Sequence, residues 1–455
     1  MRGLSKFFKP VYANDNDALI PELWAQEALM TLDANLLAAN LVHRDFEDEI
    51  ASYGDVVNAH RPADFTMQRK TDADEVTIQD AQATNVPVPL DQHLHTSFMI
   101  KDGEESKSFK SLRDMYLERA LMSIAQGVDQ VVLAQVYEFL ANLQGQIGTS
   151  LTGASLIAVR EKFNTLKAPM GGRNVILTPS QEGDLLNVDK LITADKVGDE
   201  GSALREGSLG RKYGLNMFMS QNAPSVAAGN TTVTPDVNGA QAAGTTDLVV
   251  DGGVTVVAGS WCTVEGDDTP QLITAVDADP ATQLTLDPGL RHAVDDDAVV
   301  TVYSPGAVDL VAGYAAGYTK ALTVDGFTVA PKNGQLVSFK AAGAYKYGLL
   351  PTPSITSMLL NRATDEALAN NDVAAIGPMG EYGLAFHRDA IALVTRPLAL
   401  PMSGTGAAAA VASGGGLSVR VVITYDGAKQ GHLVTVDILC GVKTLNTSLG
   451  VPLIS

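Results

Sequence analysis

The residues best suited to metal binding are two histidines, His93 and His95, in a segment of alternating apolar and polar residues. A spacing of two puts both imidazoles on one face of a strand, where they could touch one metal ion. No cysteine or pair of glutamates nearby completes a ligand set. Asp295, Asp296 and Asp297 lack the glycine and the closing glutamate of a calcium loop. We therefore favour a solvated strand face for the histidines and a polar turn for the three aspartates.

Residues suited to nucleophilic or phosphate chemistry are also sparse. The two cysteines, Cys262 and Cys440, lie in apolar segments typical of packed strands. The His-Arg-Asp triplet at 387–389 has no serine or cysteine elbow, and the glycines of the basic segment 201–212 are not spaced as a phosphate cradle. The sequence therefore predicts no catalytic site and no cofactor site, and a protein that is not an enzyme.

The first elements that would position such residues are a helix and an extended hairpin. Apolar residues recur at helical spacing over 20–42. Two segments with a period of two, 54–70 and 83–100, flank a polar stretch and predict two strands joined by a polar tip. Pro87 and Pro89 remove ladder donors, so that strand should lie at an edge. A two-stranded arm is marginal alone, so we expect it to need a partner surface in this chain or on a neighbour.

A long helix and a mixed α/β region follow the hairpin. Residues 109–143 keep one apolar face over a length of about 50 Å, with Gly127 as a possible break. A second helix is expected over 153–167 with Thr152 as its N-cap, and a buried strand and another helix follow it.

Residues 225–380 lose the helical period and contain an internal repeat. The segment 248–252 matches 322–326 at an offset of 74, and 292–300 echoes 367–375 at an offset of 75. We expect two tandem β-modules of about seventy residues, as small barrels or sandwiches. Within the remaining residues, 381–455, the segments 384–401 and 417–447 predict three or four strands, and a flexible low-complexity linker is expected at 403–416.

The charge and composition exclude some classes of protein. The net charge is −20, so a dedicated nucleic-acid binder is not the default. Residues 225–377 carry six Lys/Arg and seventeen Asp/Glu, a net charge of −11, and should face solvent rather than DNA. Two cysteines, no apolar run of membrane-spanning length and no signal-peptide pattern lead us to expect a soluble intracellular protein.

The order of these elements resembles the major capsid (coat) proteins of tailed bacteriophages, with the Hong Kong 97-type fold, in the branch that has an inserted β-domain. The segments that carry the resemblance are the following: IPELWAQEALMTLDANLLAANLVHRDFEDEIASYGDVVNAHRP (20–62), SALREGSLGRKYGLNMFMSQNAP (202–224), LAFHRDAIALVTRPLALP (384–401) and the strand pair of 417–446.

The resemblance implies an α+β fold with an all-β insertion of two tandem modules. Its parts would be an N-arm (1–50), an extended E-loop (51–106), a peripheral domain with a spine helix (107–149), an axial domain (150–224), two insertion modules (225–310 and 311–380) and C-terminal strands that complete the peripheral and axial domains (381–455), with 384–400 adding strands to the peripheral domain. The E-loop would overlie a neighbouring subunit, and Arg61, Arg69 and Lys70 on it could pair with acidic residues there. Lys70 lies in the loop that carries a cross-linking lysine in some members, but no partner asparagine matches, so that chemistry is not carried over.

The function that the resemblance implies is structural. The chain would assemble as hexamers and pentamers into the icosahedral shell of a tailed double-stranded DNA phage, in the host cytoplasm. Its partners would be copies of itself, a portal, scaffolding or decoration proteins, and packaged DNA bound without sequence specificity; no membrane is expected. Two alternatives stay open: an encapsulin-like compartment shell, and a carbohydrate- or surface-binding protein that acts through its β-modules.

Overall fold

The structure is a computed structural model of the 455-residue chain. It describes residues 19–44, 56–61, 67, 69–70, 84–105, 112–145, 147–192, 207–226, 231–256, 260–278, 280–287, 289–303, 308–325, 333–339, 347–352, 354–376, 380–402 and 406–455. The chain forms two compact units. Unit 1 contains Met1–Asn35, His93–Ile124 and Arg396–Leu439; unit 2 contains Leu36–Gln92, Ala125–Thr395 and Cys440–Ser455. Residues 1–18 of the expected N-arm lie outside the described residues.

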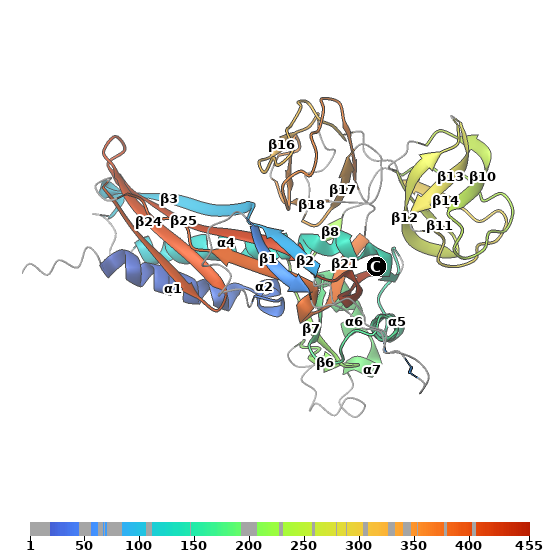
Figure 1. The fold of residues 1–455 in the computed structure, drawn as a ribbon, viewed down its shortest axis with the longest axis horizontal. Coiled ribbons are helices and arrows are strands. Elements are labelled where there is room, and N and C mark those ends of the chain that lie inside the picture. Colours follow the sequence, from blue (N-terminus) through green and yellow to red (C-terminus); the bar gives the residue numbers. More distant parts are fainter. Residues whose placement is uncertain are drawn as a thin grey trace, which may run out of the picture. The chain divides into compact units, whose positions relative to one another are not determined.

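Long antiparallel strands, one N-terminal helix and residues 112–124 of a longer helix make up most of unit 1, and one sheet contains these strands together with a strand whose residues 391–395 belong to unit 2. A five-stranded sheet has the order β22 (Ile391–Arg396), β25 (Gly431–Thr444), β24 (Leu417–Asp426) and β23 (Ala407–Gly414), and β3 (Gln92–Lys101) also pairs with β25. Helix α1 (Leu19–Asn35) packs on β23 and β24 and buries Ala25, Ala28 and Leu32 (Figure 1). A single helical turn, α3 (Asp102–Glu105), follows β3.

The expected flexible linker at 403–416 is wrong in its larger part. All eight residues of β23 pair with β24, from Ala407 opposite Thr424 to Gly414 opposite Leu417. Composition alone predicted flexibility, but short side chains let a helix approach the strand closely. A Cβ on Gly414 would lie 3.4 Å from Leu29 Cδ2. The cover provided by α1 therefore outweighs the low strand propensity of alanine. Residues 403–405 lie outside the described part of the chain.

The predicted hairpin is confirmed in unit 2 as an antiparallel pair, β1 (Val56–Arg61) and β2 (Thr84–Pro89). The second expected strand is split, because β3 begins at Gln92 and belongs to the sheet of β25. The expected helix over 20–42 is likewise split into α1 and α2 (Ala38–Leu41).

The long helix is confirmed in position and corrected in form. Helix α4 runs over Leu112–Leu133 without a break at Gly127, and the chain then continues as a 3-10 helix, η1 (Ala134–Asn142). The predicted apolar face is buried at Leu117, Leu121 and Ile124, and it continues through Val128 and Val131. A change from α to 3-10 geometry within one apolar face leaves no trace in the hydrophobic period, so the sequence did not reveal it.

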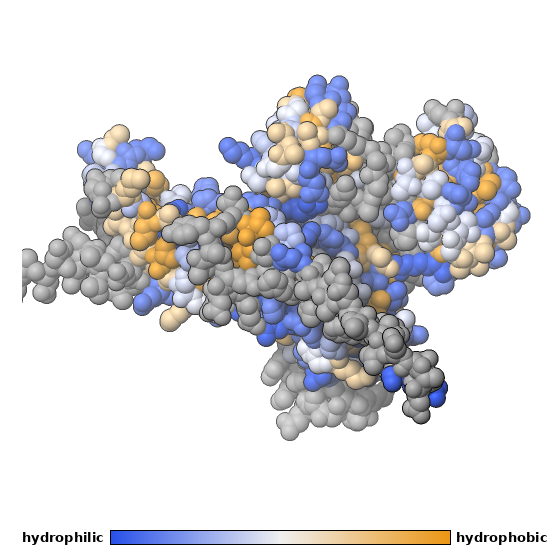
Figure 2. All heavy atoms as spheres, viewed as in Figure 1, coloured by the Kyte–Doolittle hydropathy of each residue, from blue (hydrophilic) through white to orange (hydrophobic). Residues whose placement is uncertain are grey.

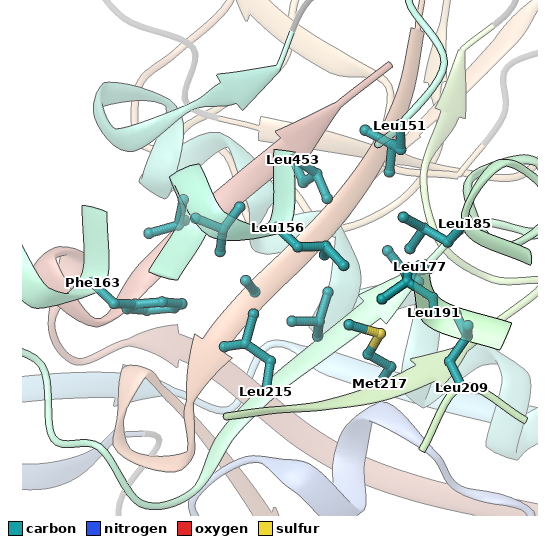
Figure 3. Packing of buried hydrophobic residues seen from close by; sticks show 14 of the residues in the cluster. Leu151, Leu156, Phe163, Leu177, Leu185, Leu191, Leu209, Leu215, Met217 and Leu453 are labelled. Atoms are coloured by element: carbon teal, nitrogen blue, oxygen red, sulfur yellow. The ribbon is translucent and has the colours of Figure 1, made fainter. Parts of the chain in front are cut away.

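A mixed seven-stranded sheet with helices forms the α/β core of unit 2. Its order is β4 (Gln144–Gly145), β26 (Gly450–Ile454), β21 (Gly380–His387), β5 (Arg173–Leu177), β7 (Leu215–Met219) and β6 (Arg211–Lys212), with β8 (Ser225–Val226) on β21. The helical elements nearby in sequence are α5 (Gly153–Thr165), α6 (Pro179–Leu186), α7 (Asp189–Ile192), η2 (Arg388–Ala390) and η3 (Thr447–Leu449). Figure 3 shows Leu156 and Phe163 of α5 directed toward Leu215 and Met217 in the cluster that this sheet buries.

Residues 384–400 divide between two sheets. Strand β21 pairs with β5 and β26 in the seven-stranded sheet, whereas β22 pairs in the sheet of β25. The segments 384–401 and 417–447 hold four strands, β21, β22, β24 and β25, which confirms the predicted number, and β23 and β26 lie outside these segments.

The internal repeat corresponds to two six-stranded sheets with the same strand order. The first is β9 (Thr231–Val233), β14 (Val300–Tyr303), β11 (Trp261–Val264), β12 (Asp267–Val276), β13 (Ala281–Asp287) and β10 (Asp247–Val254). The second is β15 (Val308–Asp309), β20 (Val373–Ile376), β17 (Leu336–Phe339), β18 (Tyr347–Leu350), β19 (Ser357–Leu360) and β16 (Leu322–Thr323). The first strand of the second sheet begins at Val308.

The offset of the second match is also corrected. Gln241 bridges to Val294 in the first sheet, and Tyr314 bridges to Leu368 in the second, so Val294 corresponds to Leu368 at an offset of 74 rather than 75. The expected polar turn is confirmed, since Asp297 adopts a φ of 63° and the equivalent Asn371 a φ of 67°.

The described residues confirm the α+β class. Hydrophilic and hydrophobic residues are mixed over the visible surface of the two six-stranded sheets (Figure 2). No helix within the described ranges has both the length and the apolar character needed to cross a bilayer.

Candidate assembly surface

The β1–β2 hairpin has two backbone edges of different chemistry. Val57 lies opposite Val88 and Asn58 opposite Pro87, while Val56 lies opposite Pro89. Proline has no N–H, so Pro87 and Pro89 fit positions that point away from β1. The alternation of an antiparallel pair then places the free N–H and C=O groups of β1 at positions 56, 58 and 60. The hairpin thus has a proline-blocked edge along β2 and a donor-bearing edge along β1.

The base of the hairpin is anchored within unit 2. Val57 and Val88 are buried in one cluster with Ala392 and Val394 of β22. A Cβ on Gly441 of β25 would collide with the carbonyl of Pro89, so the hairpin backbone approaches that strand closely. The opposite end of the hairpin, where Arg61 pairs with Thr84, leads to the other predicted contact residues, Arg69 and Lys70.

The three predicted contact residues lie along this hairpin and just beyond it. Arg61 ends β1 opposite Thr84. Arg69 and Lys70 are exposed and lie outside any helix or strand. Neither side chain makes an ion pair with a residue that the structure describes. The structure does not test their predicted pairing with a neighbour.

The two histidines of the possible metal site are both exposed on one face of β3, which confirms the expected solvated strand face, and His93 also contacts an aspartate. His93 Nε2 lies 3.1 Å from Asp437 Oδ2, and Asp437 also accepts a hydrogen bond from Arg420 Nε at 2.9 Å. The ring centroids of His93 and His95 are 6.4 Å apart. Among the described residues, no group of three potential metal ligands is gathered at one point.

The other residues with catalytic potential are separated or buried. Cys262 and Cys440 are both buried, and burial raises the pKa of each thiol to about 12, which disfavours the reactive thiolate. Asp389 lies 3.5 Å from His387 Nδ1 and 3.3 Å from His43 Nδ1. The segment 201–206 of the basic glycine-rich stretch lies outside the described residues, and Arg211 and Lys212 form a short strand of the mixed sheet.

One cavity of about 460 Å³ opens beside the first turn of α5. Ile157, Val188 and Tyr213 supply most of its larger lining side chains, and Asp189 and Lys190 supply its charges. The charged pair comes from a four-residue helix, and the remaining lining is small or apolar.

Sequence reasoning missed the residue that fixes the N-terminal segment on the long helix. The side chain of Asp129 accepts hydrogen bonds from the N–H groups of Leu37 at 2.9 Å and Ala39 at 3.0 Å. Asp129 is almost fully buried, and this burial raises its carboxyl pKa. A charged residue inside an otherwise apolar helical face is the signal that could have identified it.

Two further contacts missed by sequence reasoning surround η1. The guanidinium of Arg291, in the first six-stranded module, donates to the carbonyls of Leu140 and Ala141 at 3.2 and 3.3 Å and also to Leu143. Gly348 of β18 lies so close to η1 that a Cβ would be 2.5 Å from the carbonyl oxygen of Ala134. Each β-module therefore contacts the 3-10 end of the long helix.

Comparisons with known proteins find similar solved structures from phages. No protein-family model matches it, and no curated protein matches it in sequence. A structure from Mycobacterium phage Che8 is 14% identical with a TM-score of 0.45, covering 92% of this chain and 90% of that one. The capsid structure of cyanophage P-SCSP1u is 11% identical with a TM-score of 0.42 (89% and 84% covered), and the capsid of Ralstonia phage GP4 is 9% identical with a TM-score of 0.42 (91% and 87% covered). At these identities and TM-scores, the function has to be inferred from the residues of this chain.

Proposed function

We propose that this chain is the major capsid protein of a tailed double-stranded DNA phage, a structural and non-catalytic subunit. Hexamers and pentamers of it would build an icosahedral shell around the genome. The observation that carries this proposal is the β1–β2 hairpin, a two-stranded sheet with a donor-bearing edge that no described strand pairs with. A two-stranded sheet needs a further surface for stability, and neighbouring copies in a shell would supply one.

The order of elements along the chain supports the same proposal. Helix α1, the β1–β2 hairpin, the long helix α4 and the mixed sheet of β5 and β21 follow one another as the N-arm, E-loop, spine helix and axial domain of the resembling family do. The two six-stranded modules lie between β8 and β21, two strands that pair with each other, which suits an insertion into that sheet.

The charge distribution favours an outward position for the modules. Packaged DNA is a dense polyanion, and a net charge of −11 over residues 225–377 would be repelled from it. The modules would then face the outside of the virion, where decoration proteins could bind, while portal and scaffolding proteins would act elsewhere on the shell. Arg61, Arg69 and Lys70 would pair with acidic residues of an adjacent subunit.

The experiment that tests the proposal replaces the segment that joins β1 to β2. Residues 62–83 are replaced by a Gly/Ser linker, and a matched variant receives a Gly/Ser replacement at 340–346, between two strands of the second module. Sedimentation velocity should show that the natural chain and the matched variant assemble, whereas the hairpin variant keeps its circular dichroism spectrum and stays as small species. Assembly of the hairpin variant at the natural level would contradict the proposed role of the hairpin.

The contents of the particles separate the proposed shell from the encapsulin-like alternative. Shells purified from phage-producing cells should contain double-stranded DNA that is protected from nuclease. Shells that contain one enzyme species and no DNA would favour the compartment.

A further inference from the structure

The outer edge of strand β23 presents backbone donors and acceptors that no described residue uses. Gly415 and Gly416, with φ values of 60° and 77°, form the two-residue turn that joins β23 to β24. In such a turn the closing pair, Gly414 and Leu417, exchanges hydrogen bonds, and the pairs then alternate along the ladder. Ala407, Ala409, Val411 and Ser413 therefore direct their N–H and C=O groups away from β24.

This edge lacks the features that normally protect an edge strand. All eight residues of β23 pair in register with β24 without a bulge, and the strand contains no proline and no charged residue. The other long edge strand of the same sheet, β3, carries two histidines and ends at Lys101. Long, flat and uncharged edges are ready templates for a further strand. The edge of β23 is therefore suited to receive another chain by strand addition.

The hairpin offers one strand that fits this edge. Its β2 side is blocked by Pro87 and Pro89, so the hairpin can extend a sheet through β1 alone. The outward positions of β1 are 56, 58 and 60, and β1 itself contains no proline. Three consecutive outward positions on β1 match three of the four on β23, which makes the two edges compatible in length.

We infer that strand β1 of one subunit adds to the outer edge of strand β23 of a second copy, so that the two sheets become continuous across a subunit boundary. The inference rests on the proposed shell function and deepens it, because it names the backbone surface that receives the hairpin. Hydrogen bonds between main chains supply the contact, and Arg61, Arg69 and Lys70 lie at or beyond the end of the added strand, where they reach the same neighbour.

Cysteine pairs test which strands meet. Asn58→Cys is combined in turn with Ala407→Cys, Ala409→Cys and Val411→Cys, and assembled and unassembled fractions are separated before mild oxidation. The natural cysteines are both buried, so background linkage should be low. Facing cysteines on adjacent strands lie close enough to form a disulfide. We expect linked chains in the assembled fraction of at least one pair and none in the single variants.

Each other result overturns the inference in a recognisable way. Shells without linkage in any pair contradict the β1–β23 contact and leave the shell function intact. Disulfide-linked chains in the single variant Ala409→Cys would mean that β23 pairs with β23 of another copy, so that β1 is not the strand added to this edge. Chains that neither assemble nor link contradict both the contact and the proposed function.

Proline substitutions test the backbone donors independently of any cross-link. Ala409→Pro removes an outward N–H and should leave the melting temperature unchanged while reducing the assembled fraction by at least about fivefold. Ala408→Pro removes an inward donor to β24 and should lower the melting temperature, and Ala409→Val, which keeps the N–H, should assemble normally. Normal assembly of Ala409→Pro would contradict the inference.

Discussion

The backbone N–H of Ala39 donates a hydrogen bond to Oδ1 of Asp129 at 3.0 Å, which ties the short helix α2 to the long helix α4. The second oxygen of the same carboxylate accepts from Leu37 at 2.9 Å. The first N–H groups of a helix have no partner inside the helix, and here a buried side chain from another element satisfies two of them. One residue of the long helix thus holds the start of α2.

Replacement of Asp129 by Ala should reduce the stability of the fold. It would leave two N–H groups without a partner in a buried site, and we expect a loss of roughly 2–4 kcal/mol in the free energy of unfolding. Urea unfolding followed by far-UV circular dichroism measures this. Asp129→Asn keeps one acceptor oxygen and should cost less than Asp129→Ala. Equal stability of Asp129→Ala and the natural chain would show that water satisfies these groups equally well.

The first β-module should lose stability in acid through Asp277. This carboxylate accepts hydrogen bonds from Thr282 Oγ1 at 2.6 Å, Thr282 N at 2.8 Å and Gln283 N at 2.9 Å, and these bonds lower its pKa from 3.8 to about 2. Because the folded-state pKa is lowered, the contribution of Asp277 is present above about pH 3.8 and is lost as the pH falls toward 2.

Thermal unfolding between pH 5 and pH 2 tests whether the stabilising contribution of Asp277 is lost as the pH falls. The Trp24→Phe background leaves Trp261, in β11 of the same sheet, as the fluorescent reporter. Asp277→Asn should show a smaller fall in melting temperature over this range than the parent, and Thr282→Val should lie between them. A steeper fall for Asp277→Asn than for the parent would contradict the assignment.

Gly348→Ala should disturb the contact between the second β-module and η1. The added Cβ would lie 2.5 Å from the carbonyl oxygen of Ala134, and backbone atoms cannot move aside cheaply. Overpacking of this kind costs roughly 1–3 kcal/mol, measurable by urea unfolding. The matched control is Gly171→Ala, where nothing lies within 4 Å of the new Cβ. Similar stability of the two variants would mean that the module does not rest on η1 in solution.

Removal of the two exposed charges, Arg69 and Lys70, should make the shells less resistant to salt and to denaturant. The double variant Arg69→Ala, Lys70→Ala loses two surface contacts, each worth about 0–1 kcal/mol, but the contacts repeat with every subunit. We expect dissociation at lower salt and lower denaturant concentration, measured by light scattering.

The control for this charge effect removes the same total charge elsewhere. The double variant Lys320→Ala, Lys429→Ala removes two positive charges at positions away from the hairpin sequence. Its shells should dissociate at the same salt and denaturant concentrations as the natural shells. Unchanged shell stability in the Arg69→Ala, Lys70→Ala variant would contradict the predicted role of these residues.

Local periodicity predicted the elements whose stability is also local. The alternation over 54–70 and 83–100 identified the β1–β2 hairpin, and the apolar face over 109–143 identified α4. The tandem match at 248–252 and 322–326 identified two modules, which share one strand order. In each case the residues that determine the element stand next to one another in the chain.

Features that depend on distant residues could not be predicted in the same way. Strand β23 was expected to be a flexible linker, because its alanines and glycines become a strand only when β24 and α1 pack against them. The carboxylate of Asp129 meets Leu37 across 92 positions of sequence, and Arg291 reaches Leu143 across 148. The free edges of β1 and β23 follow from register, which a single sequence does not specify.

Electron microscopy of the purified chain, expressed alone and together with the products of the neighbouring genes, shows whether it assembles. Closed shells, tubes or capsomer rings tens of nanometres across, built from hexamers and pentamers of this one chain, are expected. A chain that stays monomeric under both conditions would contradict the capsid function and would favour a binding protein that acts through its β-modules.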